Sequence, residues 1–415
     1  MMHRPFPALR RCRLQVGLLA GLLALMLAGA DTGARADDIV IGSLVPMTGD
    51  LQAYGQDILN GSILAVEEIN AAGGVLGRSL ALAVGDTQTK PQAGVDTAQK
   101  LVALEGAVAL VGALSSGVTI PIASSVSKPN RVVQISNAST SPVITTLDDD
   151  DFLFRTIPSD AFQGVALGQV VYESELANVA TLYINNDYGE GLALSFKSAF
   201  EALGGVNSVA LPYEPNNASY RGELAAAARE GAVALLLIGY PENGVIILRQ
   251  ALEEGYFSRF IFTDGMKSPK IVEAIGSYLD GSIGTNPQAM EGSQTTQNFM
   301  DAYEAHFGSP VLVPFVDAAY DAVYLLALAM EAAGSVDKVA IRDHLRAIAA
   351  PPGEPVGPGE WSKAKALIAQ GQEINFEGAA GAQDFDANGD VDGTFAFWKI
   401  EGGEFVTIKV FKPGG

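Results

Sequence analysis

Strand-like and helix-like segments alternate along this chain, and this alternation restricts the fold more than any other feature. The segments 38–49, 79–86, 107–113 and 131–136 are largely continuous apolar runs, and segments with helical spacing of apolar residues separate them. Continuous apolar runs are typical of parallel strands that are buried on both faces, with helices as the connections. The sequence therefore predicts an α/β fold with doubly wound parallel sheets.

The same pattern starts again further along the chain, so we expect a second lobe of similar plan. From about Thr295 to Ala349 the chain is mainly helical, residues 351–361 form a Pro/Gly-rich surface loop, and a strand and a hairpin end the chain at 374–378 and 393–411. The second set of alternating helices and strands comprises 161–175, 178–185, 188–205, 206–213, 219–231, 232–240, 241–256 and 259–265.

The first 36 residues have the features of a secretory signal peptide. Several arginines precede an apolar block at 14–30, and the small-x-small sequence at 34–36 predicts cleavage after Ala36. A retained membrane anchor is the alternative. The only cysteine, Cys12, lies in this segment, so we expect a mature chain without disulfides.

The net charge of −21 argues against nucleic acid or anionic lipid as a partner. The most apolar later segment, 315–334, is interrupted by Asp317, Asp321 and Glu331. We therefore interpret it as a buried helix and not as a membrane span.

Two predicted neighbouring strands of the first lobe end in clusters of small hydroxyl residues. Ser115, Ser116 and Thr119 follow one strand, and the cluster after the other includes Ser139 and Thr140. Ligands of open parallel sheets bind beyond the carboxyl ends of the strands, where hydroxyl groups can donate hydrogen bonds to a carboxylate. The alternative is that these residues only cap helices.

The second lobe presents two tyrosines and a carboxylate at the corresponding strand ends. Tyr188, Tyr240 and Asp264 each follow a predicted strand. Ordinary packing of the tyrosines and a turn role for Asp264 are the alternatives.

Other chemistry finds little support in the sequence. His306 and His344, in separate predicted helices, suit neither a zinc site nor a catalytic triad, and we find no Gly-rich phosphate loop. We therefore expect no enzyme activity, no cofactor and no metal. The segment 384–395 partly matches a calcium loop, but Phe395 replaces the required Glu, and a hairpin turn at Asn388-Gly389 is simpler.

The two hydroxyl clusters and the residues Tyr188, Tyr240 and Asp264 lie in motifs that resemble those of a known family. Together the motifs resemble the periplasmic leucine/isoleucine/valine-binding proteins of ABC importers, which have the type I periplasmic-binding-protein fold. The similarity runs over nearly all of the chain after residue 36 and includes GALSSGVTIPIA, NASTSP, NDYGEGLA, GYPENGVIILRQA and FTDG. It implies a monomeric periplasmic protein that captures an amino acid, branched-chain or otherwise apolar, and delivers it to a membrane permease. A sensory module for a small amide or amino acid is the alternative.

The resemblance also implies roles for individual residues. Ser116 and Thr140 would hold the ligand carboxylate, and the Ala138 carbonyl and Asp264 would hold the ammonium. The aromatic residues Tyr54, Tyr188, Tyr240 and Tyr320 would enclose the ligand, and Ser115 and Ser139 belong to the same hydroxyl clusters.

Lobe boundaries follow from the same resemblance. Lobe 1 would comprise 39–157 and 288–378, and lobe 2 would comprise 159–285 and 385–411. Three hinge crossings near 156–159, 284–288 and 378–385 would connect the lobes, which would close over the ligand. Two departures stand out. Asp264 replaces the usual Glu, and Thr89 and Ser115 stand where the best-known members have a disulfide.

Overall fold

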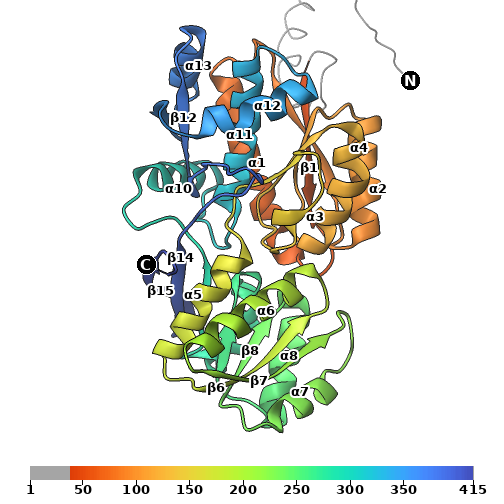
Figure 1. Ribbon diagram of the computed structural model, residues 1–415, viewed down its shortest axis with the longest axis vertical. Helices are drawn as coiled ribbons and strands as arrows, with labels where there is room; N and C mark the ends of the chain where they lie inside the picture. Colours follow the sequence, from red (N-terminus) through yellow and green to blue (C-terminus); the bar gives the residue numbers. More distant parts are fainter. Residues whose placement is uncertain (1–37, 415) are drawn as a thin grey trace, which may run out of the picture. The chain divides into compact units, whose positions relative to one another are not determined.

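The first part of the chain builds a five-stranded parallel sheet in the computed structural model, which describes residues 38–414 (Figure 1). The strand order is β2-β1-β3-β4-β5, so the strands that precede the two hydroxyl clusters, β3 and β4, are hydrogen-bonded neighbours. All pairs in this sheet are parallel, which brings the carboxyl ends of β3 and β4 to one edge. The strands are β1 (Ile39–Val45), β2 (Leu80–Asp86), β3 (Ala109–Gly112), β4 (Val133–Ser136) and β5 (Leu153–Arg155).

Helices from two distant parts of the sequence pack with this sheet. The most buried is α11, in which every residue from Val316 to Met330 except Asp317 is buried. The prediction of a buried helix at 315–334 is therefore confirmed, and no helix in residues 38–414 is long and apolar enough to cross a membrane. The helices are α1 (Gln52–Ala71), α2 (Pro91–Ala103), α3 (Ser116–Ile122), α4 (Lys128–Asn130), α10 (Gln294–Phe307), α11 (Val316–Ala333) and α12 (Lys338–Ala349), with a π-helical turn at Ala123–Ser127 and a 3-10 turn at Ile144–Thr146.

A second sheet of seven strands follows, in the order β7-β6-β8-β9-β10-β14-β15. The five strands from β7 to β10 in this order are parallel. The C-terminal hairpin of β14 and β15 joins the sheet because β14 pairs with β10 in antiparallel orientation. The strands are β6 (Asn178–Ile184), β7 (Val206–Tyr213), β8 (Ala234–Ile238), β9 (Phe260–Phe262), β10 (Ile283–Pro287), β14 (Phe395–Glu401) and β15 (Glu404–Phe411). The helices are α5 (Asp160–Glu173), α6 (Asp187–Ala202), α7 (Arg221–Ala228), α8 (Pro241–Glu253) and α9 (Pro269–Ile275), with 3-10 turns at Asp264–Met266 and Gly276–Leu279.

The two helix-flanked parallel sheets confirm the predicted fold class, although the structure contains elements that the sequence pattern did not indicate. A small third sheet comprises β11 (Glu354–Val356), β12 (Ile374–Gly378) and β13 (Gly381–Ala382), and α13 (Trp361–Ala369) lies between β11 and β12. The predicted loop 351–361 thus includes β11, which forms because it pairs with β12. Trp361, 1% exposed, donates its indole N–H to the carbonyl of Gly74 and fixes the start of α13.

Hydrogen bonds connect α11 to two of the predicted hinge crossings. The Thr156 hydroxyl donates to the carbonyl of Ala318 at 2.9 Å. The buried carboxylate of Asp321 accepts the N–H groups of Ala379 and Ala380 at 2.7 and 2.8 Å. The lobe boundaries themselves stay a prediction.

Residues 384–395 form a tight turn without a surrounding hairpin. The Asp386 carboxylate accepts the N–H groups of Asn388 and Asp390, while Asp390 forms a bidentate ion pair with the fully buried Arg155. Both carboxylates are thus engaged within the protein, and residues 38–414 contain no group of three or more His, Cys, Asp or Glu residues that could hold a metal.

Candidate ligand-binding site

The hydroxyl clusters at the ends of β3 and β4 divide into two groups. Thr119, Ser136 and Ser139 fasten the two loops to each other, because all three hydroxyls donate to the carbonyl of Ala113, at 3.1, 2.7 and 3.2 Å. Thr119 and Ser139 also contact each other at 2.8 Å. Ser139 therefore connects the two loops and is not among the residues that line the cavity between the two sheets.

The other group faces the second sheet. Ser116, Ala138 and Leu114 line a buried cavity, and the Ser116 hydroxyl oxygen accepts the N–H of Ser141 at 3.2 Å. Ser115, which precedes α3, contacts the Tyr240 hydroxyl at 3.1 Å.

The opposite wall of the cavity comes from the strand ends of the second sheet. The rings of Tyr188 and Tyr240 are stacked with centroids 5.7 Å apart. The Tyr188 hydroxyl donates to the Asp264 carboxylate at 3.0 Å, and the Gln163 amide donates to the same oxygen at 2.8 Å. Ten residues line the cavity: Leu51, Tyr54, Leu114, Ser116, Ala138, Tyr188, Tyr240, Asp264, Gly265 and Phe315.

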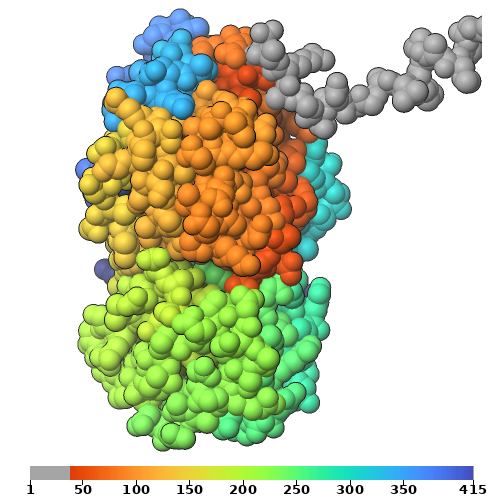
Figure 2. All heavy atoms as spheres, turned by 90° about the vertical axis from the view of Figure 1, so that its right-hand side faces the viewer, coloured from red at the N-terminus to blue at the C-terminus, as the bar shows by residue number. Residues whose placement is uncertain are grey.

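Contacts across this cavity join the two sheets directly. The Tyr54 hydroxyl, from α1, donates to the carbonyl of Gly265 at 3.0 Å, and Gln52 donates to Glu242 at 2.7 Å. Figure 2 shows the corresponding red-to-orange and green parts of the chain in contact. The cavity has a volume of only about 20 Å³, room for about one water molecule. A larger ligand therefore requires these walls to separate.

Asp160 is a second buried carboxyl group beside Asp264, and the sequence analysis missed it. Its carboxylate accepts the Thr140 hydroxyl at 2.8 Å, so Thr140 is engaged by Asp160 and does not line the cavity. Ser159 caps α5 by accepting the N–H of Ala161, and Asp160 follows as its first residue. An acidic residue in that position is typical of an ordinary helix start, so no sequence signal separates it from a capping residue.

The electrostatics of this carboxyl pair favour a positively charged partner. Burial raises the pKa of Asp264 to about 6, although hydrogen bonds from Gln163 and Tyr188 lower it in part. Burial, and then the charge of Asp264, hold the pKa of Asp160 well above its usual range, against the opposing effects of Thr140 and Arg155. Two buried carboxylates repel each other, and a cation between them would relieve that repulsion.

Tyr320 requires a correction, because the structure does not bring it to this cavity. Its hydroxyl donates to Glu68 and accepts the N–H of Gly359, and its ring stacks on Tyr324 with centroids 4.8 Å apart. Tyr320 belongs to the face of α11 that packs on α1, whereas Phe315, just before α11, lines the cavity.

Thr89 and Ser115, the two positions where the resemblance implied a disulfide in other members, each form a hydrogen bond with a different residue. The Thr89 hydroxyl oxygen accepts the N–H of Leu51 at 3.1 Å, and Ser115 contacts Tyr240. Both positions therefore help to hold residues that line the cavity.

Comparison with known proteins agrees with this arrangement. The family model described as periplasmic binding protein matches residues 38–404. The chain belongs to this periplasmic binding protein family. It is 31% identical over 327 residues to the leucine-, isoleucine-, valine-, threonine-, and alanine-binding protein of Pseudomonas aeruginosa, covering 78% of this chain and 86% of the relative.

Two further relatives extend the comparison. A Leu/Ile/Val-binding protein homolog 1 of Brucella suis is 31% identical over 311 residues, covering 74% of this chain and 81% of the relative. The crystal structure of a leucine-binding protein from Thermotoga maritima superposes with a TM-score of 0.78 at 24% identity, covering 90% of this chain and 99% of that one. The predicted family and the two-lobed type I fold are thereby confirmed.

Proposed function

We propose that this periplasmic binding protein captures an amino acid with an apolar side chain and delivers it to the membrane permease of an ABC importer. The observation that carries the proposal is the distribution of polar groups around the cavity. A hydroxyl donor, Ser116, lies on one side, and Asp264, with Asp160 behind it, lies on the other. A carboxylate and an ammonium on one ligand match this arrangement.

The remaining walls favour an apolar side chain. Leu51, Leu114 and Phe315 supply aliphatic and aromatic surface, and the stacked tyrosines supply more. The relatives named for binding leucine, isoleucine and valine support this choice. Tyr54, Tyr188 and Tyr240 would enclose the ligand when the lobes close around it.

A calorimetric comparison of matched ligands tests the proposal. We expect L-leucine, L-isoleucine or L-valine to bind, and both 4-methylpentanoate and isopentylamine to bind at least tenfold more weakly than L-leucine, because each lacks one charged group. The variant Asp264→Asn should weaken L-leucine strongly and 4-methylpentanoate little, since the latter has no ammonium. Equal, small losses for both ligands would contradict the ammonium role of Asp264.

The proposed location is the periplasm, with the mature monomer starting at Asp37. The predicted signal peptide, residues 1–36, lies outside the described residues, and the family match, which starts at residue 38, supports the assignment. N-terminal sequencing of the exported protein should therefore yield Asp37-Asp38-Ile39. A mature protein that retains the apolar block 14–30 would contradict cleavage.

A further inference from the structure

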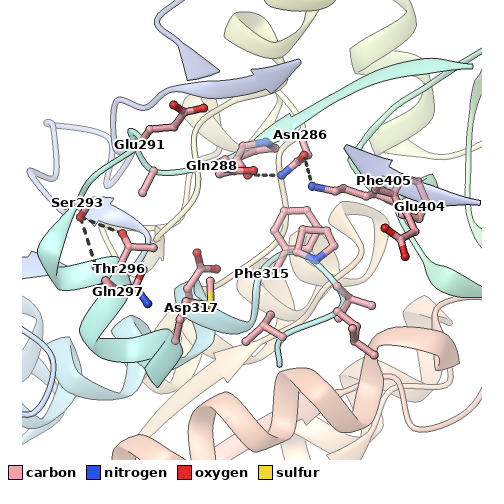
Figure 3. Close-up of a pocket in the computed structure, with 18 of the residues that line it drawn as sticks. Asn286, Gln288, Glu291, Ser293, Thr296, Gln297, Phe315, Asp317, Glu404 and Phe405 are labelled. Atoms are coloured by element: carbon pink, nitrogen blue, oxygen red, sulfur yellow. Dashed lines mark hydrogen bonds between the residues drawn. The ribbon is translucent and has the colours of Figure 1, made fainter. Parts of the chain in front are cut away.

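A second, much larger cavity lies behind Phe315, and the proposed function makes no use of it (Figure 3). Its volume is about 880 Å³, within the range of small-molecule sites. Phe315 lines both cavities and so separates one from the other. The walls come from residues 286–297 and 311–317, from the region of α9, and from the turn between β14 and β15.

Much of the wall is apolar, so the cavity can accommodate a hydrocarbon group. Met290 and Leu312 are more than half exposed at its rim, while Val313 and Phe315 are buried. The main apolar lining residues are Val272, Met290, Met300, Val311, Leu312 and Phe405.

Two opposite charges face this cavity without forming an ion pair with each other. Lys267 donates to the Asn286 side-chain oxygen at 3.0 Å, and its ammonium lies 6.0 Å from the ring centre of Trp398. The Asp317 carboxylate, which Figure 3 shows on the cavity wall, accepts the N–H of Ala318 at 2.9 Å and forms no ion pair within residues 38–414.

The environment of both groups disfavours their charged forms. Burial lowers the pKa of Lys267 to about 8, and the Asp317 charge opposes this effect. Burial likewise raises the pKa of Asp317, although the N–H of Ala318 and the charge of Lys267 lower it. The two groups thus interact across the cavity while neither has a charged partner in direct contact, so both would gain from a ligand that supplies one.

We propose that this cavity is a second binding site for a small zwitterion. The ligand carboxylate would approach Lys267, its ammonium would approach Asp317, and its hydrocarbon part would lie against Met290, Met300 and Phe405. A simple anion would leave Asp317 without a charged partner, and a simple cation would leave Lys267 without one. The exposed carboxylates of Glu273, Glu291 and Glu404 lie at the rim, where solvent and salt screen them. They therefore influence the choice of ligand less than Lys267 and Asp317 do.

Calorimetry with L-leucine and with 5-aminopentanoate, whose charges are further apart, tests the proposal on the whole mature chain. We expect at least one of the two to bind Asp264→Asn, in which the first cavity is impaired. Pentanoate and pentylamine should bind at least tenfold more weakly than the zwitterion that binds. Lys267→Met and Asp317→Asn should each weaken this second binding event at least tenfold, as expected for the loss of a charged partner.

Controls separate this effect from damage to the fold. Lys197→Met removes an exposed lysine on α6 that lines neither cavity, and it should bind like the wild type. Val311→Trp fills the second cavity without a change in charge and should also abolish the second binding event. Failure of both zwitterions to bind at concentrations up to about 10 mM, or wild-type binding by Lys267→Met and Asp317→Asn, would overturn the proposal.

Discussion

Asp160 and Asp264 place two carboxyl groups in one buried region that disfavours their charged forms. Asp160 is fully buried and Asp264 is 3% exposed, and the charge of Asp264 adds to burial in raising the pKa of Asp160. One oxygen of Asp160 has no hydrogen-bond partner among residues 38–414. The cost of burying these two carboxylates would be offset when a ligand ammonium enters the cavity. Binding energy commonly compensates for such locally unfavourable features at functional sites.

Acidification should therefore weaken ligand binding. With the pKa of Asp264 near 6, its carboxylate gains a proton as the pH falls through that value, and a neutral carboxyl cannot pair with an ammonium. We expect the dissociation constant of L-leucine to be nearly constant above pH 7 and to rise up to about tenfold per pH unit below pH 6. Calorimetry between pH 5 and 8 measures this, and Asp264→Asn should lack most of the dependence.

The stability of the ligand-free protein should respond to Asp264 in the opposite sense. Because its pKa is higher in the folded than in the unfolded state, this group adds stability as the pH falls from about 6 towards 3.8. Between pH 6.5 and 5, the wild type should gain stability relative to Asp264→Asn in urea unfolding. A relative loss would show that the carboxylate is favourably paired within the protein.

Thr140 provides a third test at the scale of single residues. Its hydroxyl donates to Asp160 and does not line the small cavity, whereas the family resemblance implies that it holds the ligand carboxylate. Thr140→Val keeps the shape and removes the hydroxyl, which should weaken L-leucine by about 1.5–3 kcal/mol, or tenfold and more. The matched control is Thr97→Val on α2, whose hydroxyl donates to the backbone carbonyl of Asp86, away from the site. Unchanged affinity in Thr140→Val would remove Thr140 from the site.

Sequence patterns predicted residues that line the cavity where these directly follow a strand, but they missed Gln163 and Asp160 on α5. Ser116, Tyr188, Tyr240 and Asp264 were predicted because strand ends of a parallel sheet meet at one edge. Gln163 lies within α5, and its direction towards Asp264 depends on how that helix packs on the second sheet. Tyr320 was expected at the cavity, but the sequence does not show which face of the largely buried α11 points to α1.

At the scale of elements, the short strands depend most on distant partners. The three-residue strands β5 and β11 are too short to show a period, and they form beside β4 and β12 respectively. The long helices and the strands β1, β6 and β8 were predictable because each has enough residues to show its own pattern of apolar residues. The C-terminal hairpin was also predicted, but its place beside β10 depends on the tertiary fold.

The ion pair between Arg155 and Asp390 joins β5 to the segment before β14. Arg155 is fully buried, its nitrogens contact both Asp390 oxygens at 2.6 and 2.7 Å, and it also donates to the carbonyl of Ser141. Arg155→Met should reduce the free energy of unfolding by about 3–5 kcal/mol, because it leaves a largely buried carboxylate without its cation.

A double substitution and a surface control make this test specific. Arg155→Met combined with Asp390→Leu should recover part of the loss, because it removes the unpaired charge. Lys409→Met breaks the exposed pair with Glu173 and should change stability by less than about 1 kcal/mol. Urea denaturation measures all four proteins, and equal effects of Arg155→Met and Lys409→Met would contradict the structural role of the buried pair.

At the scale of the whole molecule, the proposed function requires the two sheets to separate and close again. The cavity of about 20 Å³ is much too small for a leucine to enter unless the contacts of Tyr54 with Gly265 and of Ser115 with Tyr240 open. We expect the predicted hinge crossings, which form hydrogen bonds with α11 at Thr156 and Asp321, to limit this opening. Ligand binding should therefore favour the closed arrangement.

Gly191 offers a way to obstruct this closure without touching the cavity. It lies on α6, and a Cβ atom there would approach the Cδ of Pro142, beyond β4, to 2.7 Å. Gly191→Leu should therefore hold the lobes apart, raise the dissociation constant of L-leucine at least tenfold and prevent the decrease in radius of gyration that we expect for the wild type on saturation. Gly222→Leu, on α7 with nothing within 4 Å of its Cβ, is the matched control and should bind and contract normally. Calorimetry and small-angle X-ray scattering measure the two effects. Full contraction and unchanged affinity of Gly191→Leu would show that the contact between α6 and Pro142 is not part of the closed state that binds ligand.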